Sequence, residues 1–245
     1  MLAIIGGSGL SQLPCMEFQR REVMRTPYGE PSGPVTFGTL KERPAAFLAR
    51  HGYGHTIAPH EINYRANLWA LRELRATRVV SVAAVGGIRE DLVPGTVVVP
   101  HQIIDYTWGR RHTFFEGEAP VTHIDFTEPF SAEARADILA AALACNEPVV
   151  DGAVYAATQG PRLETAAEID RLERDGAEIV GMTAMPEAAL AKELELPYAA
   201  IAVVANFAAG RGDSRSRINL DEIDAVLRNG MLRVARMIEQ LAGKT

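Results

Sequence analysis

The chain has 245 residues, which is enough for one α/β domain with a well-buried core. Hydrophobic residues make up 47% and charged residues 23%, as is typical of a globular protein. The net charge of −6 and the lack of any Lys/Arg-rich run argue against a nucleic-acid-binding face, and the lack of an apolar run of about 18 residues argues against a membrane span.

The cysteine content and the first residues of the chain bear on its location. Two cysteines, Cys15 and Cys145, are fewer than a disulfide-stapled secreted domain usually carries, so we expect a reducing compartment and a cytoplasmic protein. The apolar start of the chain lacks a basic n-region, and it therefore indicates a buried strand rather than a signal peptide.

Apolar β-branched runs alternate with helical patterns along the whole chain. In chain order we predict a strand at 2–5, hairpin-like turns within 27–49, a helix at 63–76, strands at 79–85 and 96–100, a helix at 132–144, a strand at 149–158, helices at 164–175 and 185–195, a strand at 199–204 and a helix at 220–241. This alternation predicts an α/β fold in which one domain, residues 1–245, has a central mixed β-sheet flanked by helices. Ligands of such sheets bind at the carboxyl ends of the strands.

A glycine-rich loop, Gly6-Gly7-Ser8-Gly9, follows the first predicted strand. It lacks the third glycine of the dinucleotide fingerprint and the lysine of a phosphate-binding Walker loop. Its amides and the Ser8 hydroxyl are able to cradle an anion, although a simple tight turn is the preferred explanation when the loop is taken alone.

Arg50-His51-Gly52 ends a strand-like run and is followed by His55. An arginine can fork onto two phosphate oxygens and a histidine can donate a further hydrogen bond, whereas the alternative is a solvated surface turn. These histidines and His60 lack the helical spacing of a zinc-binding pair, so we predict no metal.

Two further polar residues follow predicted strands. Glu164 comes after Gly160-Pro161-Arg162, and Asn206 comes after the strand at 199–204. Taken alone, Glu164 is explained by a favourable charge at a helix start and Asn206 by a turn.

Together these segments resemble the family of trimeric purine nucleoside phosphorylases and methylthioadenosine phosphorylases over nearly the whole chain. The matching motifs are Ile5-Gly6-Gly7-Ser8-Gly9-Leu10, Arg50-His51-Gly52, His55-Thr56-Ile57, Asn63-Tyr64-Arg65-Ala66-Asn67, Ala84-Val85-Gly86-Gly87, Asp91 with Pro94-Gly95, His123 before Glu128-Pro129-Phe130, Gly160-Pro161-Arg162, Met182-Thr183 with Pro186-Glu187, and Ala191-Lys192-Glu193.

The resemblance implies a phosphate site and a ribose contact. Phosphate would be bound by Ser8, Arg50, His51, the backbone of Ala84 and Thr183, and Met182 would pack on the ribose. One departure is that Ala83 stands where methylthioadenosine phosphorylases carry a threonine, so one side-chain contact to phosphate is missing.

The resemblance also implies which base is read. Asn206 and Glu164, with Leu163 beside them, occupy base-binding positions. Members of the family that act on inosine and guanosine carry Asn and Glu there, whereas adenine-specific members carry Asp and lack the Glu. An amide donates to O6 of a 6-oxopurine and a carboxylate accepts its N1–H, so catalysis is expected to depend on Asn206, Glu164 and His51.

For the 5′ end of the sugar, the resemblance points to the methylthio enzymes. Leu220 and Ile223 match their apolar 5′ residues, although without the resemblance the core face of the last helix is the preferred explanation of both. His123 matches the residue that those enzymes contribute from a neighbouring subunit, so we expect a homotrimer.

The combined expectation is a pentosyltransferase that phosphorolyses 5′-methylthioinosine in purine salvage. Its partners would be a small-molecule nucleoside and phosphate, with no nucleic acid or membrane, and inorganic phosphate would be a co-substrate with no cofactor. Methylthioadenosine phosphorolysis and inosine/guanosine phosphorolysis remain the alternatives, and a nucleoside-binding protein without turnover is a further one.

Overall fold

One mixed β-sheet runs through the computed structural model, which describes residues 1–117 and 119–243. Its strands are β1 (Leu2–Gly6), β2 (Glu17–Glu22), β3 (Val35–Leu40), β4 (Arg43–Ala49), β5 (Arg78–Gly87), β6 (Val97–Val99), β7 (Gln102–Asp105), β8 (Val150–Asp151), β9 (Val154–Ala157), β10 (Ile179–Gly181) and β11 (Tyr198–Phe207). The helices are α1 (Tyr64–Glu73), α2 (Ala132–Ala144), α3 (Ala166–Arg174), α4 (Ala184–Glu193) and α5 (Leu220–Ala242), with a short 3-10 helix, η1 (Gly212–Ser214).

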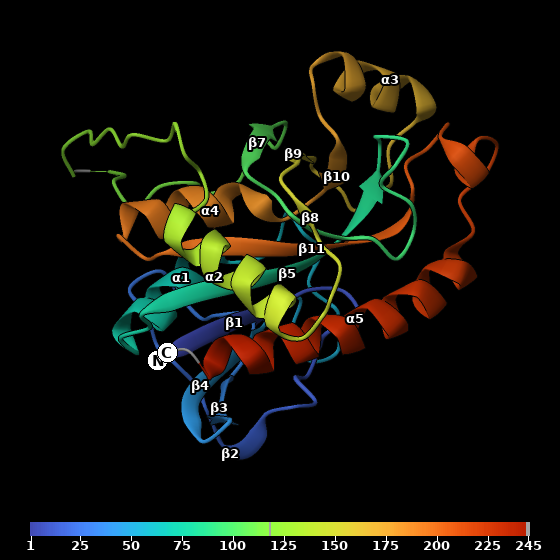
Figure 1. Ribbon diagram of the computed structural model, residues 1–245. Helices are drawn as coiled ribbons and strands as arrows, with labels where there is room; N and C mark the ends of the chain where they lie inside the picture. The colour runs from blue at the N-terminus through green and yellow to red at the C-terminus, as the bar shows by residue number, and fades with distance from the viewer. Residues whose placement is uncertain (118, 244–245) are drawn as a thin grey trace.

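Helices cover both faces of the sheet, as the alternating sequence pattern predicts. Along β1, Leu2 and Ile4 pack in one hydrophobic core with α2 and α5, whereas Ala3 and Ile5 pack in a second core with α1 and α4. Figure 1 shows α2 and α5 side by side on their face of the sheet. The predicted fold class, a single α/β domain with a central mixed sheet flanked by helices, is confirmed.

Strand β5 changes its neighbour halfway along one edge, and this change creates the space for a site. Its first half pairs in parallel with β1 up to Ser81, and its end pairs antiparallel with β10 at Gly86 and Gly87. Within the described residues, positions 82–85 of that edge have no strand partner. The opposite edge of β5 pairs with β11 throughout. Val82, whose carbonyl accepts from Arg50 Nη1, and Ala84, two residues further on, therefore direct their backbone groups into the gap between β1 and β10.

Several predicted elements agree closely with the structure. The helix predicted at 132–144 is α2, which Ser131 caps by accepting a hydrogen bond from Ala134 N (3.2 Å). The hairpin-like segment contains the antiparallel pair of β3 and β4. Within the described residues, none of the helices has both the length and the apolar character that crossing a bilayer demands.

Two predicted elements are corrected. The helix predicted from 164 starts later, because Thr165 caps α3 in a capping box with Glu168, and Glu164 lies in the preceding loop. The strand predicted at 149–158 is split into β8 and β9 by Gly152, whose φ of +95° breaks the extended backbone. As a result, β8 pairs with β6 and β9 pairs with β7 and β10.

Candidate active site

A cavity of about 450 Å³ lies in the gap where β5 passes from β1 to β10. Its lining comes from segments that are distant in sequence: Gly7 and Ser8 after β1; Arg50, His51 and residues 55–59 after β4; residues 83–86 of β5; Pro161, Leu163 and Glu164; residues 180–183; Ala205, Asn206 and Ala208; and Ile218, Ile223 and Leu227. The cavity thus gathers most of the residues that the sequence singles out.

The glycine loop after β1 brings the Ser8 side chain to the cavity. A Cβ added at Gly6 would lie 2.1 Å from Leu10 O, and one added at Gly7 would lie 2.7 Å from Arg50 Nη1. Both positions therefore require glycine because the backbone passes so close to its neighbours. The loop makes a tight turn, with Leu10 N donating to Gly7 O, and it also lines the cavity, whereas anion binding by the loop stays a prediction.

Arg50 is buried at the end of β4, and its side chain is largely occupied by the protein itself. Its Nε and Nη2 donate to the two carboxylate oxygens of Glu187, each at 2.8 Å, and Nη1 donates to Val82 O at 2.9 Å. Glu187 also accepts from the Tyr198 hydroxyl at 2.8 Å. Burial works against the positive charge, but the Glu187 carboxylate outweighs it and raises the pKa of Arg50. The fork of Arg50 therefore holds Glu187, and only its remaining N–H groups can reach a ligand.

The imidazole of His51 is held by the backbone. Its Nδ1 lies 2.9 Å from Ile57 O, and because a carbonyl only accepts, Nδ1 carries the proton. Burial and the neighbouring Arg50 cation lower the pKa of His51 to about 4, so the ring is neutral at pH 7. In a neutral ring with Nδ1 protonated, Nε2 is a hydrogen-bond acceptor.

His55 stands beside this ring at the cavity wall. The centroids of the two imidazoles are 4.6 Å apart, and His55 Nε2 lies 3.4 Å from Ser8 Oγ. In the part of the chain that the structure describes, no group of three or more His, Cys, Asp or Glu side chains is arranged to hold a metal ion.

Met182 and Thr183 reach the cavity from the connection between β10 and α4. Thr183 is the N-cap residue of α4, yet within the described chain its side chain makes no capping hydrogen bond. The backbone of Met185 is not helical (φ −115°, ψ 137°), so the regular turns of α4 begin only after it, and Thr183 lies before that start, at the cavity wall. The sulfur of Met182 packs under Gly160, where a Cβ would lie only 2.4 Å from it.

Glu164 and Asn206 line the same cavity from two further connections. Glu164 accepts a hydrogen bond from Thr158 Oγ1 at 2.7 Å, which leaves its second carboxylate oxygen available. Asn206 follows a β-bulge in β11, where the register against β5 shifts between Val204 and Asn206. A bulge changes the direction in which the following side chain points. The Nδ2 of Asn206 donates to Phe207 O at 2.6 Å and retains one N–H.

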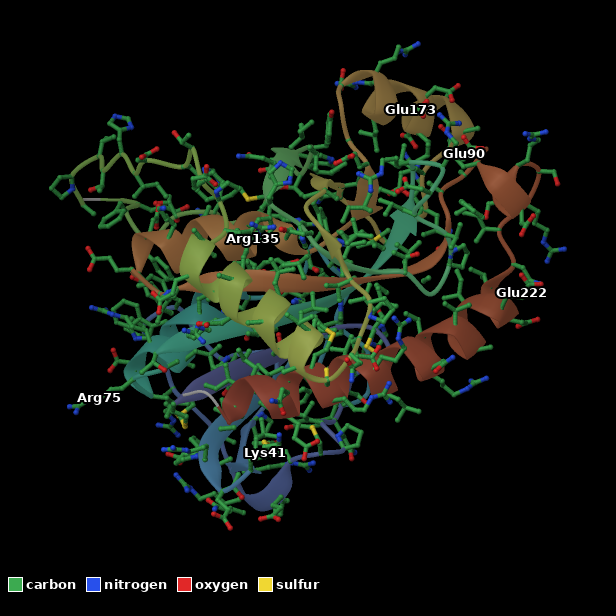
Figure 2. The ribbon with its side chains drawn as sticks, in the orientation of Figure 1. Lys41, Arg75, Glu90, Arg135, Glu173 and Glu222 are labelled. Atoms are coloured by element: carbon green, nitrogen blue, oxygen red, sulfur yellow. The ribbon has the colours of Figure 1, made fainter. Side chains whose placement is uncertain are left out.

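An apolar wall completes the cavity, and it differs from the predicted one. Ile223, predicted to contact the 5′ end of the sugar, lines the cavity, together with Ile218 and Leu227. Leu220 is not among the lining residues, and it is 64% exposed. Leu220 is the first residue of α5, so its side chain extends beyond the helix start, where the last helix offers nothing to pack against. Figure 2 shows Glu222, in the same turn, pointing outward.

Of the other predicted residues, Ala84 and Leu163 line the cavity, the latter at its rim with 40% exposure. His123 is exposed in the segment before α2 and does not line this cavity. Sequence reasoning assigned no role to Glu187 or Arg110, both of which are buried behind the cavity wall. The signal for Glu187 was present in the Pro186-Glu187 motif, whereas nothing in the pattern around Arg110 marks it as buried.

Comparisons with known proteins agree with this arrangement. Residues 1–242 match the family model described as "Phosphorylase superfamily". A relative named "Probable S-methyl-5'-thioinosine phosphorylase", from Pseudomonas syringae pv. tomato, is 52% identical over 95% of this chain and 94% of its own. A "6-oxopurine nucleoside phosphorylase" from Pyrococcus furiosus is 47% identical over 85% of this chain and 80% of its own. The solved structure of methylthioadenosine phosphorylase from Schistosoma mansoni in complex with adenine superimposes with a TM-score of 0.94, at 32% identity, over 99% of this chain and 91% of that one.

Proposed function

This chain belongs to the phosphorylase superfamily, and from that premise we propose that it catalyses the phosphorolysis of 5′-methylthioinosine to hypoxanthine and 5-methylthioribose 1-phosphate. The observation that carries the proposal is the composition of one cavity. It combines anion-binding groups, an Asn and Glu pair suited to a 6-oxopurine, and an apolar wall. Residues 1–245 act as one nucleoside phosphorylase domain in this proposal.

Phosphate binds, in this proposal, to Ser8, the free N–H groups of Arg50, His51, the backbone N–H of Ala84 and Thr183. The unpaired stretch of β5 supports the role of Ala84, because its amide lies on an edge without a strand partner in the described residues. A neutral His51 accepts rather than donates, so its Nε2 takes a hydrogen bond from a protonated phosphate oxygen. This reverses the direction of donation expected from the sequence.

The chemistry follows from these positions. A phosphate oxygen forms a bond to the anomeric carbon C1′ as the C1′–N9 bond breaks, and the electron pair of that bond passes to the purine. The proton of hydrogen phosphate ends on a purine nitrogen, which gives neutral hypoxanthine and the sugar 1-phosphate. The phosphate is the nucleophile and its negative charge also stabilises the cationic sugar, so the protein contributes positioning and electrostatics. This reaction requires neither a protein nucleophile nor a cofactor.

In this proposal Asn206 and Glu164 determine which purine base the cavity accepts. Asn206 retains one N–H for O6 of hypoxanthine, and the free oxygen of Glu164 accepts from N1–H. Adenine presents a lone pair at N1, so an ionised Glu164 facing it would be unpaired, a mismatch of about 1–3 kcal/mol. The two residues thus favour a 6-oxopurine over adenine.

In this proposal the apolar wall determines which group is preferred at the 5′ position of the sugar. A 5′-methylthio group in contact with Ile218, Ile223 and Leu227 would be preferred over a hydroxyl by roughly 10- to 200-fold. A hydroxyl there would lose its water without gaining a good partner. No histidine follows His123 in the sequence, so no imidazole from α5 can receive a 5′-hydroxyl.

A second candidate is phosphorolysis of ordinary 6-oxopurine nucleosides such as inosine and guanosine. It is favoured by the 47% identity to the relative named 6-oxopurine nucleoside phosphorylase. The apolar wall opposes it, and methylthioadenosine phosphorolysis is opposed by Asn206 and Glu164.

Release of free hypoxanthine from 5′-methylthioinosine tests the proposal. We expect release that requires phosphate and that arsenate supports in its place, because either anion can attack C1′. Binding of the nucleoside without release of hypoxanthine in either anion would make this chain a nucleoside-binding protein instead.

A further inference from the structure

Arg110 is a buried arginine behind the cavity that the proposed reaction does not use. It is 7% exposed and follows β7 in the segment that leads towards α2. Its Nη1 donates to Met182 O (2.7 Å), Met185 O (2.6 Å) and the Tyr64 hydroxyl (3.2 Å). All of these acceptors are uncharged.

The other side of the same guanidinium binds a different connection. Nη2 donates to Thr158 O (3.2 Å) and Gln159 O (2.9 Å), and Nε donates to Gln159 Oε1 (3.3 Å). Thr158 is the residue whose hydroxyl binds Glu164. One planar group therefore joins the β9–α3 connection, which carries Glu164, to the β10–α4 connection, which carries Met182.

The bonding pattern requires arginine. A lysine ammonium has three donors on one atom, whereas the flat guanidinium spreads five donors over a fork that reaches oxygens on two segments. Across residues 1–117 and 119–243, Arg110 has no carboxylate within ion-pair distance. A buried charge that is balanced only by neutral oxygens is costly to hold, which suggests that it is kept for a purpose other than stability.

We propose that Arg110 is a positioning residue that sets the spacing between the base-reading Glu164 and the ribose-facing Met182. This inference rests on the proposed function. Nucleoside recognition depends on Arg110 because both connections that contact the nucleoside are tied to it. Phosphate recognition depends on Arg110 less. Of the proposed phosphate-binding residues, only Thr183 lies on a connection that Arg110 binds, and Arg50 is linked to Arg110 only indirectly, through Glu187 in α4.

The test compares Arg110→Lys and Arg110→Met with the wild type in steady-state kinetics on 5′-methylthioinosine and phosphate. We expect KM for the nucleoside to rise about tenfold or more in both variants, with a smaller rise for Lys, because a sub-ångström displacement of binding groups is costly. KM for phosphate should change by less than about threefold. Arg111→Met is the matched control, since Arg111 is the exposed neighbour paired with Glu116, and it should leave both constants unchanged.

A second readout separates positioning from mere stability. Arg110→Lys should also lose part of the preference for 5′-methylthioinosine over 5′-methylthioadenosine, because Glu164 is no longer fixed against the base. Equal changes in KM for the nucleoside and for phosphate, with an unchanged preference between the two nucleosides, would overturn the inference. A Lys variant that fails to fold would also overturn it, since Arg110 would then be only structural. An inactive wild type would instead refute the proposed function.

Discussion

At the scale of single residues, the buried pair of Arg50 and Glu187 connects the stability of the fold with the proposed phosphate site. Both carboxylate oxygens of Glu187 accept from Arg50, and Tyr198 donates to one of them. Removing one partner of a buried ion pair typically costs about 3–5 kcal/mol, because the remaining charge is left without compensation. Glu187 therefore holds Arg50 in place as well as neutralising it.

Glu187→Gln is expected to raise KM for phosphate about tenfold or more and to lower the melting temperature, because the amide can accept only one of the two Arg50 hydrogen bonds. Glu195→Gln, an exposed substitution beyond the end of α4, is the control. Unchanged phosphate dependence in Glu187→Gln would show that Arg50 does not bind phosphate.

His51 gives a prediction for stability against pH. Its pKa is about 4 in the folded protein and about 6.5 in the unfolded chain, so between these values the unfolded state binds more protons. Lowering the pH from about 6.5 to 4 therefore destabilises the phosphate-free protein through this group, by about 2–3 kcal/mol.

Chemical denaturation across that pH range measures the effect. His51→Gln should lose less stability than the wild type as the pH falls, whereas His60→Gln, at an exposed position, should follow the wild type. Parallel curves for His51→Gln and the wild type would contradict the neutral state of His51 on which its acceptor role depends.

At the scale of elements, the bulge in β11 directs Asn206 to the cavity. Asn206→Asp replaces the proposed donor to O6 by a carboxylate. This should weaken transition-state binding of 5′-methylthioinosine by about 1–3 kcal/mol, which lowers kcat/KM roughly 5- to 150-fold, and it should shift the preference towards the adenine nucleoside. Asn146→Asp, exposed at the end of α2, is the control. If Asn206→Asp leaves the ratio of the two substrates unchanged, Asn206 has no part in base recognition.

The first turns of α5 offer a paired test of the apolar wall. Ile223 lines the cavity and Leu220 does not. Ile223→His should narrow the gap in kcat/KM between 5′-methylthioinosine and inosine, because an imidazole can bind the 5′-hydroxyl. Leu220→His should leave the gap unchanged, and a larger effect at Leu220 than at Ile223 would mean that α5 moves when substrate binds.

The elements also show what sequence could and could not predict. The alanine-rich helix α2 was predicted to the residue, whereas the predicted bounds of α1 and α4 differ from the structure by one to three residues at their ends. Helical periodicity places Leu220 and Ile223 on one face of α5. Periodicity does not show which residues of that face have neighbours, and Leu220, in the first turn, is exposed. Arg110 could not be found at all, because its role comes from carbonyl groups about 50 and 70 residues away that only the fold brings together.

At the scale of the whole molecule, the exposed His123 is expected to complete the site of a neighbouring subunit in a homotrimer. Mixing chains that carry Arg50→Ala with chains that carry His123→Ala should then restore activity, since one site in a mixed trimer has an intact Arg50 and receives an intact His123. Light scattering should give a mass of three 26.6 kDa chains. A monomeric mass, or mixed trimers without recovered activity, would refute the shared site.

The whole fold was easier to predict than the site, for a physical reason. The two hydrophobic cores follow from the nearly continuous apolar runs of β1 and β5, because successive side chains of a strand point to opposite faces of the sheet. The cavity depends on β5 exchanging β1 for β10, and β10 is a three-residue strand with too little pattern to identify. The resemblance to known phosphorylases supplied most of the site residues, and the geometry then separated Ile223 from Leu220.

The substrate specificity proposed for the cavity is tested by the catalytic efficiency of the wild-type protein on four nucleosides: 5′-methylthioinosine, inosine, 5′-methylthioadenosine and adenosine. The apolar wall predicts that kcat/KM falls roughly 10- to 200-fold from 5′-methylthioinosine to inosine. The Asn206 and Glu164 pair predicts a fall of at least about tenfold from 5′-methylthioinosine to 5′-methylthioadenosine. Equal efficiency on 5′-methylthioinosine and inosine would contradict the proposed role of the apolar wall. A preference for either adenine nucleoside would contradict the proposed role of Asn206 and Glu164.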